Sequence, residues 1–115
     1  MVHSTAFKFS RDEGRLIENV VFIELMRRKK SIYYEGNGTE CDFVIKEGME
    51  IKEALQVCAS LSDKKTRQRE IKGLTDAMRK YGLKNGCIIT MYHEEKIAID
   101  NMIIDVKPLW KFLLG

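Results

Sequence analysis

The hydrophobic period of this chain changes twice within the first 81 residues, and this constrains the fold more than any other feature. Apolar residues recur every three to four positions from Gly14 to Arg28, which predicts an amphipathic helix. Strand signals follow between about residues 32 and 59, and helical spacing returns from Ser62 to Tyr81. Ser62-Asp63 is expected to start this second helix, and Gly82 lies where a C-cap glycine belongs. A helix, an antiparallel meander and a second helix are therefore expected in this order.

The remaining residues predict a further strand, a hairpin and a short helix. Gly86 to Met91 is a short, almost wholly apolar run, as expected of a strand covered on both faces. Residues 97–99 and 102–106 predict two more strands joined by a turn, and Pro108 is expected at the first position of a last helix. The order α-β-β-β-α-β-β-β-α predicts one α/β domain, a mixed sheet with flanking helices.

The first helix is expected to begin with a capping box, in which Ser10 caps the helix and Glu13 reaches back to it. Residues 1–9 show no clear period and are expected to form a loose arm. The apolar stripe of the helix is wide enough to predict burial between the sheet and another helix. This stripe comprises Ile17, Val20, Val21 and Leu25, widened by Leu16, Phe22, Ile23 and Met26.

Alternation within the meander predicts which side chains share a face of the sheet. Asn37-Gly38 is a strong hairpin signal and precedes a cleanly alternating segment from Thr39 to Lys46. In that segment Phe43 and Ile45 are expected on one face and Asp42 and Val44 on the other. In the next strand the expected faces are Ile51, Leu55 and Val57 against Ala54, Gln56 and Cys58.

Composition excludes several classes of protein. A chain of 115 residues is too short for two domains that each bury a core, so residues 1–115 are expected to be one domain. No segment approaches the ~20 apolar residues of a membrane span, and the N-terminus lacks the pattern of a secretory signal. The cysteines number three, an odd count without metal-site spacing, which favours a reduced cytoplasmic protein.

The charge is mildly basic, with a net charge of +3. One basic cluster, residues 27–30, is expected to complement the dipole at the end of the first helix. The other lies on the second helix, where it forms either a solvated face or a surface for nucleic acid. Its members are Lys64, Lys65, Arg67, Arg69 and Lys72, and the first four are the candidate DNA contacts.

The element order, together with several short stretches, resembles the restriction-endonuclease-like PD-(D/E)XK nucleases. Within that superfamily the chain is similar to the uncharacterised C-terminal domain of archaeal and bacterial AAA-type ATPases. The ATPase part itself is absent, because the sequence has no Gly-rich phosphate loop of Walker type. The stretches that carry the resemblance, from residue 12 onward, are GRLIEN at 14–19, ECDFV at 40–44, LQVC at 55–58, REIKGL at 69–74 and PLWK at 108–111.

The resemblance implies where a nuclease site would lie. The acid of the first helix falls on Glu18, and the metal-binding aspartate falls on Asp42. The (D/E)-X-K triplet falls on Gln56-Val57-Cys58, where the middle residue would lend its backbone carbonyl to Mg²⁺ or Mn²⁺. The sequence departs from the pattern twice, because an amide replaces the acid and a thiol replaces the lysine.

These departures predict a weakened site. The neutral amide of Gln56 removes one negative charge from a Mg²⁺ site, and Cys58 has neither the reach nor the charge of a lysine. One positioned electrostatic donor is worth about 10²–10³ in rate, so efficient hydrolysis is not expected. A degenerate nuclease-like domain that binds nucleic acid or a partner protein, attached to an ATPase domain, is the expected function.

Two alternatives remain open from the sequence. One is an active Mg²⁺-dependent DNA nuclease in which Glu40 or Glu53 replaces the missing acid, and the other is a structural module that forms a homodimer. If these residues have only a structural role, Gln56 is a buried polar residue satisfied by a neighbour and His93 is a solvated loop residue. Trp110 and Phe112 are expected to pack in the core.

The nuclease interpretation requires a particular register between the strands that carry Asp42 and Gln56. Their side chains can share a face only if the hairpin closes with an odd loop or a bulge. A three-residue loop from Glu47 to Met49 is predicted, with Lys46 opposite Glu50 and Asp42 opposite Ala54.

Overall fold

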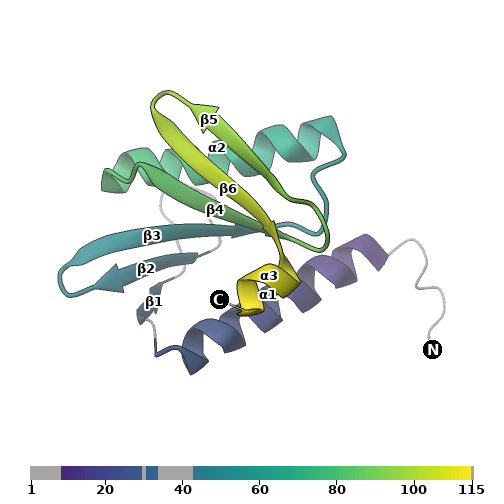
Figure 1. Cartoon of the computed structure of the whole chain (residues 1–115), viewed down its shortest axis with the longest axis horizontal. Helices are drawn as coiled ribbons and strands as arrows, with labels where there is room; N and C mark the ends of the chain where they lie inside the picture. The colour runs from purple at the N-terminus through teal and green to yellow at the C-terminus, as the bar shows by residue number, and fades with distance from the viewer. Residues whose placement is uncertain (1–8, 30, 34–42, 115) are drawn as a thin grey trace.

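A computed structural model describes residues 9–29, 31–33 and 43–114 of the chain (Figure 1). Asp42, Glu40 and Cys41, as well as the predicted Asn37-Gly38 turn, lie outside the described residues. The elements are α1 (Phe9–Arg27), β1 (Ser31–Tyr33), β2 (Phe43–Glu47), β3 (Glu50–Val57), α2 (Lys64–Tyr81), β4 (Asn85–Thr90), β5 (Glu95–Ile99), β6 (Met102–Pro108) and α3 (Leu109–Leu114).

The described strands form one mixed sheet in the order β1-β2-β3-β4-β6-β5. β3, β4 and β6 run parallel to one another, whereas β1, β2 and β5 pair antiparallel with their neighbours. Helices α1 and α3 lie on one side of this sheet, and α2 lies on the other (Figure 1). The predicted α/β class, a mixed sheet with flanking helices, is therefore confirmed.

Alternation along the strands supplies a separate apolar layer to each face of the sheet. Towards α2 the layer contains Val44, Ala54, Leu74, Met78 and Ile88, all at most 2% exposed. Towards α1 it contains three α1 residues together with strand residues and the end of α3; these are Ile17, Val21, Leu25, Phe43, Ile45, Leu55, Val57, Ile89 and Phe112. The predicted facing of β2 is thus confirmed for its described residues.

Helix α1 differs from its prediction in two ways. It begins at Phe9, so Ser10 lies inside the helix and is not its cap. The expected burial of the whole apolar stripe is wrong, because Leu16, Ile23 and Met26 are 57%, 64% and 56% exposed. The helix packs against the sheet along Ile17, Val21 and Leu25, and this side of α1 does not include Leu16, Ile23 or Met26.

Helix α2 has both of its predicted boundaries. Asp63 caps the N-terminus by accepting hydrogen bonds from the Thr66 backbone N–H at 2.9 Å and from the Thr66 hydroxyl at 3.0 Å. These bonds lower the pKa of the Asp63 carboxyl below its usual value. Gly82 ends the helix with φ 68°, a left-handed conformation that glycine adopts without steric cost.

The β2–β3 hairpin has a register that the sequence did not reveal. Its loop has two residues, Gly48 and Met49, between the paired Glu47 and Glu50, so the predicted three-residue loop is wrong. Lys46 pairs with Ile51, because a bulge follows the Ile45–Glu53 pair. The bulge also turns Ile51 to the α2 side with Ala54, and not to the Leu55 side as expected.

The C-terminal segment places two residues differently from expectation. Pro108 ends β6, paired with Thr90, and α3 starts one residue later. Phe112 is buried as expected, but Trp110 is 58% exposed, so its assignment to the core is wrong. The β5–β6 turn lies at Asp100-Asn101 as predicted, with positive φ at both residues.

None of the helices in the described part of the chain is both long and apolar enough to span a membrane.

Candidate functional site: a hollow at the end of β3

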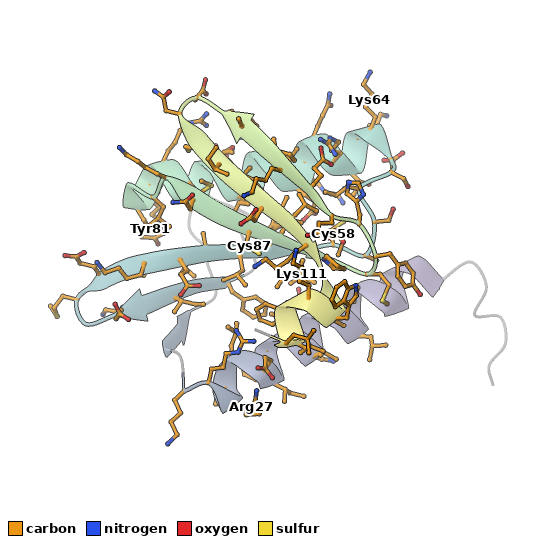
Figure 2. All side chains as sticks on the ribbon, viewed as in Figure 1. Arg27, Cys58, Lys64, Tyr81, Cys87 and Lys111 are labelled. Carbon is orange, nitrogen blue, oxygen red and sulfur yellow. The ribbon has the colours of Figure 1, made fainter. Side chains whose placement is uncertain are left out.

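An open hollow of about 470 Å³ lies where β3 ends and α2 begins. Val57 and Cys58, two of the three residues of the predicted triplet, belong to its wall. Figure 2 shows Cys58 at this end of the sheet and Lys64 at the start of α2. The lining residues are Gly14, Val57, Cys58, Ala59, Ser60, Ser62, Asp63, Thr66, Arg69 and Glu70.

Glu18, the predicted acid of the first helix, lies on the side of α1 that borders β2 and β3. Residues four apart are neighbours on one helix face, so Glu18 lies between Gly14 and Phe22. Gly14 lines the hollow, and the Phe22 ring stacks on Phe43 of β2 with centroids 6.4 Å apart. Glu18 is half-buried on this face, and its role as the acid of the first helix stays a prediction.

Gln56 points to the opposite face of the sheet. Its side chain is 2% exposed, and its Nε2 donates a hydrogen bond to the Glu70 backbone carbonyl on α2 at 3.3 Å. Its strand neighbours Leu55 and Val57 face α1. The structure therefore does not bring the Gln56 amide and Glu18 to a common face. The alternative in which Gln56 is a buried polar residue satisfied by a neighbour fits its contacts.

Cys58 follows the last residue of β3. Its backbone N–H donates to the Ile89 carbonyl at 3.0 Å, which extends the parallel pairing of β3 with β4. Its thiol donates to the Ser60 carbonyl at 3.1 Å. The end of β3 thus presents a neutral thiol to the hollow at the position where the nuclease pattern has a lysine.

The wall of the hollow contains charged residues that sequence reasoning did not assign to the site. Glu70 contributes a carboxylate from α2, and the Nε of Arg69 lies 3.6 Å from its Oε2. The hydroxyl groups of Ser60 and Ser62 lie 2.9 Å apart on the loop before α2. Glu70 belongs to the REIKGL stretch that carried part of the resemblance, but that stretch gave no signal that the Glu70 carboxylate lies beside the end of β3.

The predicted DNA-contacting residues are not equivalent. Lys64 and Lys65 are exposed in the first turn of α2, and Arg69 lines the hollow. Arg67 instead forms two hydrogen bonds to Glu95 of β5, at 2.8 and 2.9 Å. The Nε2 of His93 lies 2.7 Å from the same carboxylate. These partners, Arg67 first, lower the pKa of Glu95 to about 2; Arg67 thus ties α2 to the sheet edge.

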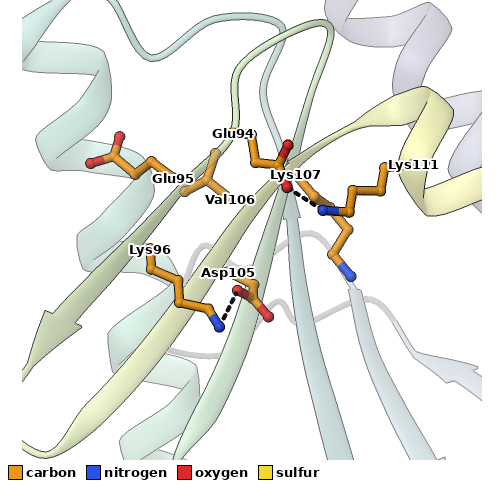
Figure 3. Close-up of a pocket in the computed structure, with 7 residues that line it drawn as sticks. All are labelled: Glu94, Glu95, Lys96, Asp105, Val106, Lys107 and Lys111. Atoms are coloured by element: carbon orange, nitrogen blue, oxygen red, sulfur yellow. Dashed lines mark hydrogen bonds and ion pairs between the residues drawn. The ribbon is translucent and has the colours of Figure 1, made fainter.

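A second hollow, of about 390 Å³, lies over the β5–β6 surface beside α3 (Figure 3). Its walls are crossed by two ion pairs, Lys96 with Asp105 at 3.8 Å and Lys111 with Glu94. Acidic and basic residues balance there, so this hollow has no charge preference that would select a ligand.

The metal prediction depends on residues that lie partly outside the described ranges. Within residues 9–29, 31–33 and 43–114, no three His, Cys, Asp or Glu side chains are grouped closely enough to hold a metal ion. The predicted aspartate, Asp42, is not among these residues, and neither is Glu40. Glu53, the other proposed replacement acid, is exposed in the part of β3 that precedes the buried stretch and does not line the hollow. Mg²⁺ or Mn²⁺ binding thus stays a prediction.

Comparison with known proteins connects the chain to a longer archaeal protein. No model of a known protein family matches the sequence. The uncharacterised protein MJ1544 of Methanocaldococcus jannaschii is 35% identical over 120 residues, which cover 95% of this chain and 26% of that protein. The chain is therefore similar to a segment that makes up about a quarter of its archaeal relative.

Proposed function

We propose that this chain is a restriction-endonuclease-like domain that binds nucleic acid in the cytoplasm and has lost efficient hydrolysis. The observation that carries the proposal is the hollow at the end of β3, which the Cys58 thiol lines at the position that the resemblance aligns with the catalytic lysine. Gln56, which the resemblance aligns with the acid, is a buried amide hydrogen-bonded to α2 and does not line the hollow. Arg69 and the hydroxyl groups of Ser60, Ser62 and Thr66 line the hollow together with the carboxylates of Asp63 and Glu70. The exposed Lys64 and Lys65 lie in the adjoining first turn of α2, and these cations support binding of a phosphate backbone over its cleavage.

The argument against hydrolysis concerns charge. The Gln56 amide is engaged by the Glu70 carbonyl and carries no negative charge for a metal. The Cys58 thiol carries no positive charge for a developing oxyanion. Each lost group costs orders of magnitude in rate, so two losses in one site leave binding as the activity that the remaining residues support.

The argument for nucleic acid also concerns charge. Lys64 and Lys65 extend into solvent, and Arg69, 62% exposed, stands in the hollow wall. Lysine and arginine side chains gathered beside a hollow supply the sequence-independent part of nucleic-acid affinity. The longer archaeal relative, of which the chain matches about a quarter, supports the further proposal that such a domain operates within a larger polypeptide. That an ATPase domain accompanies it is proposed from the resemblance alone.

The test measures the affinity for duplex DNA by fluorescence anisotropy. It compares the parent with two variants that remove the same charge near opposite ends of α2. We expect K64A/K65A/R69A to lose most of the affinity. The matched control, R79A/K80A/K84A, also removes two lysines and one arginine, but from the last turn of α2 and the residues just after it, and should bind like the parent. Equal binding by all three proteins would refute the proposed surface.

A second candidate function follows from Glu70. This carboxylate lines the hollow next to Cys58, and an acid supplied by α2 would replace the one missing from β3. We propose it as the alternative, an active Mg²⁺-dependent nuclease with a rearranged site. The test is cleavage of plasmid DNA with Mg²⁺ or Mn²⁺. Cleavage by the parent that both Glu70→Gln and Asp42→Ala abolish would establish this alternative. No cleavage by the parent would leave the binding domain as the proposal.

A further inference from the structure

The outer surfaces of α1 and α3 carry most of the exposed large apolar side chains in the described part of the chain. Nine such residues are more than a third exposed there, and six belong to these two helices. The other three are scattered over the β2–β3 turn, the loop after β4 and β6. The six form what we call the α1–α3 face: Leu16, Ile23, Met26, Trp110, Leu113 and Leu114.

These side chains belong to two neighbouring elements. Helices α1 and α3 contact each other and lie side by side on the same side of the sheet, with α2 on the far side (Figure 1). Leu16 and Ile23 are seven residues apart, which places them on one face of α1, two turns from each other. The half-buried Val20 lies between them. The largest apolar patch on a monomeric protein is often a functional surface.

The α1–α3 face is held in place by Arg28. Its Nη2 donates to the Phe112 carbonyl of α3 at 2.6 Å, and its guanidinium lies 4.7 Å from the centre of the Phe112 ring. Glu24 accepts from both Arg28, at 2.7 Å, and Arg27, at 2.8 Å. The two helices are therefore fixed relative to each other, so a partner would not need to order them.

The same contacts reduce an electrostatic obstacle to self-association. Arg27 is 70% exposed beside the apolar residues, and two copies of an uncompensated arginine would repel each other across a symmetric interface. The Glu24 carboxylate, which Arg27 and Arg28 share, offsets one of their two positive charges, and these arginines lower the pKa of Glu24 to about 2.

The exposed apolar area fits a small dimer interface. The exposed fractions of the six side chains range from 38% to 80%. A fully exposed large aliphatic side chain has about 60–120 Å² of surface, and a tryptophan has about 150–250 Å². Multiplied by the exposed fractions, these areas give the face on the order of 250–500 Å² of exposed apolar surface. The smallest stable interfaces bury about 600 Å² on each partner, roughly 65% of it apolar in homodimers, or about 400 Å².

We infer that the chain forms a two-fold symmetric homodimer through the α1–α3 face, with micromolar affinity. A symmetric dimer needs only one self-complementary surface. An axis near Asn19, which is exposed midway between the two apolar positions, sets Leu16 of one copy against Ile23 of the other in antiparallel helices. Trp110 and Leu113 of α3 then cover the flank of this helix pair. This inference is independent of nucleic-acid binding.

The test is sedimentation equilibrium of the chain from about 1 to about 200 µM, a range that brackets the micromolar affinity inferred for the dimer. We expect a reversible monomer–dimer equilibrium. The variant L16E/I23E should raise the dissociation constant at least about 100-fold, because it places charges in the apolar centre of the interface. The control, M49E/Y92E, changes two side chains that are 92% and 83% exposed elsewhere and should dimerise like the parent.

A second variant guards against loss of folding in L16E/I23E. Asn19→Cys, close to the proposed axis, should form disulfide-linked dimers on mild oxidation, beyond those of the parent and of a Met49→Cys control. A parent that stays monomeric at about 200 µM would overturn the inference and leave the face to another polypeptide. A dimer that L16E/I23E leaves intact, or an Asn19→Cys variant that cross-links no more than the parent, would overturn it equally.

Discussion

The contact between α2 and β4 provides a quantitative test of the fold that positions the site. An ideal Cβ built on Gly86 of β4 would lie 2.6 Å from the Met78 Sδ and 3.2 Å from the Leu74 Cδ2. Ordinary contacts of this kind are about 3.5–4.0 Å, so Gly86→Ala demands a shift of nearly 1 Å at the sulfur. Leu74 and Met78 are both 0% exposed, so neither can move into solvent.

The expected cost follows from two opposing effects. Overpacking of a filled core costs about 1–3 kcal/mol, whereas the loss of glycine's freedom in the unfolded chain returns about 0.4–1 kcal/mol. We therefore expect Gly86→Ala to lower the free energy of unfolding by about 1–2 kcal/mol in urea titrations, with an unchanged m-value. Gly14→Ala is the control, because a Cβ added at Gly14 would meet nothing within 4 Å and helix α1 favours alanine.

A double-mutant cycle identifies the cause. In a Met78→Ala background the sulfur is gone, so Gly86→Ala should cost at least about 1 kcal/mol less than in the parent. Equal costs in both backgrounds, or a Gly86→Ala protein as stable as the parent, would refute the close approach of α2 to β4 and with it the placement of α2 beside Gln56.

Three further predictions concern single residues. Asp63→Ala should lower the free energy of unfolding by about 0.5–2 kcal/mol in the same titrations, because it removes the N-cap of α2, and Asp63→Asn should restore most of the loss. Glu95 has a folded-state pKa of about 2 against an ordinary 4.5, so its contribution to the free energy of unfolding is complete above about pH 4.5 and is lost as the pH falls towards 2. Glu95→Gln should therefore make the melting temperature fall less steeply between pH 5 and pH 2.5, and an unchanged slope would contradict the Arg67–Glu95 pairing. Burial raises the pKa of Cys87 to about 11. Iodoacetamide at about pH 8 should therefore label Cys87 more slowly than Cys58, which peptide mapping after a brief treatment would measure. Faster labelling of Cys87 would contradict its burial.

The sequence was most informative where one residue determines local geometry. Asp63 and Gly82 bound α2 as predicted, because a side-chain cap and a left-handed glycine act within a few residues. The alternation of Phe43, Val44 and Ile45 likewise predicted their faces, since this depends on the strand alone. The α/β class followed from the order of such local signals.

Features that depend on distant contacts were predicted poorly. A bulge in the β2–β3 hairpin leaves no mark on hydrophobic alternation, so the loop length and the facing of Ile51 were wrong. An apolar stripe does not reveal how many neighbours it has, and Leu16 and Ile23 therefore turned out exposed. The pairing of Arg67 with Glu95 joins residues 28 positions apart, and no local pattern predicts it.

The candidate site shows the same division. The resemblance predicted that the end of β3 is the place of interest, and Val57 and Cys58 do line the hollow there. It did not predict that the Gln56 side chain contacts α2, because the alternation that groups Gln56 with Ala54 does not say which helix covers that face of the sheet. Glu70 entered the site only through the fold, since α2 brings it to β3 from 14 residues away.

The salt dependence of DNA binding tests the central claim most directly. Each phosphate contact contributes about 0.9 to the slope of log K against log salt for duplex DNA. If Lys64, Lys65 and Arg69 are the contacts, K64A/K65A/R69A should reduce this slope by about 2.7, while R79A/K80A/K84A leaves it unchanged. A slope that is the same in the parent and K64A/K65A/R69A, or that falls equally in both variants, would contradict the account.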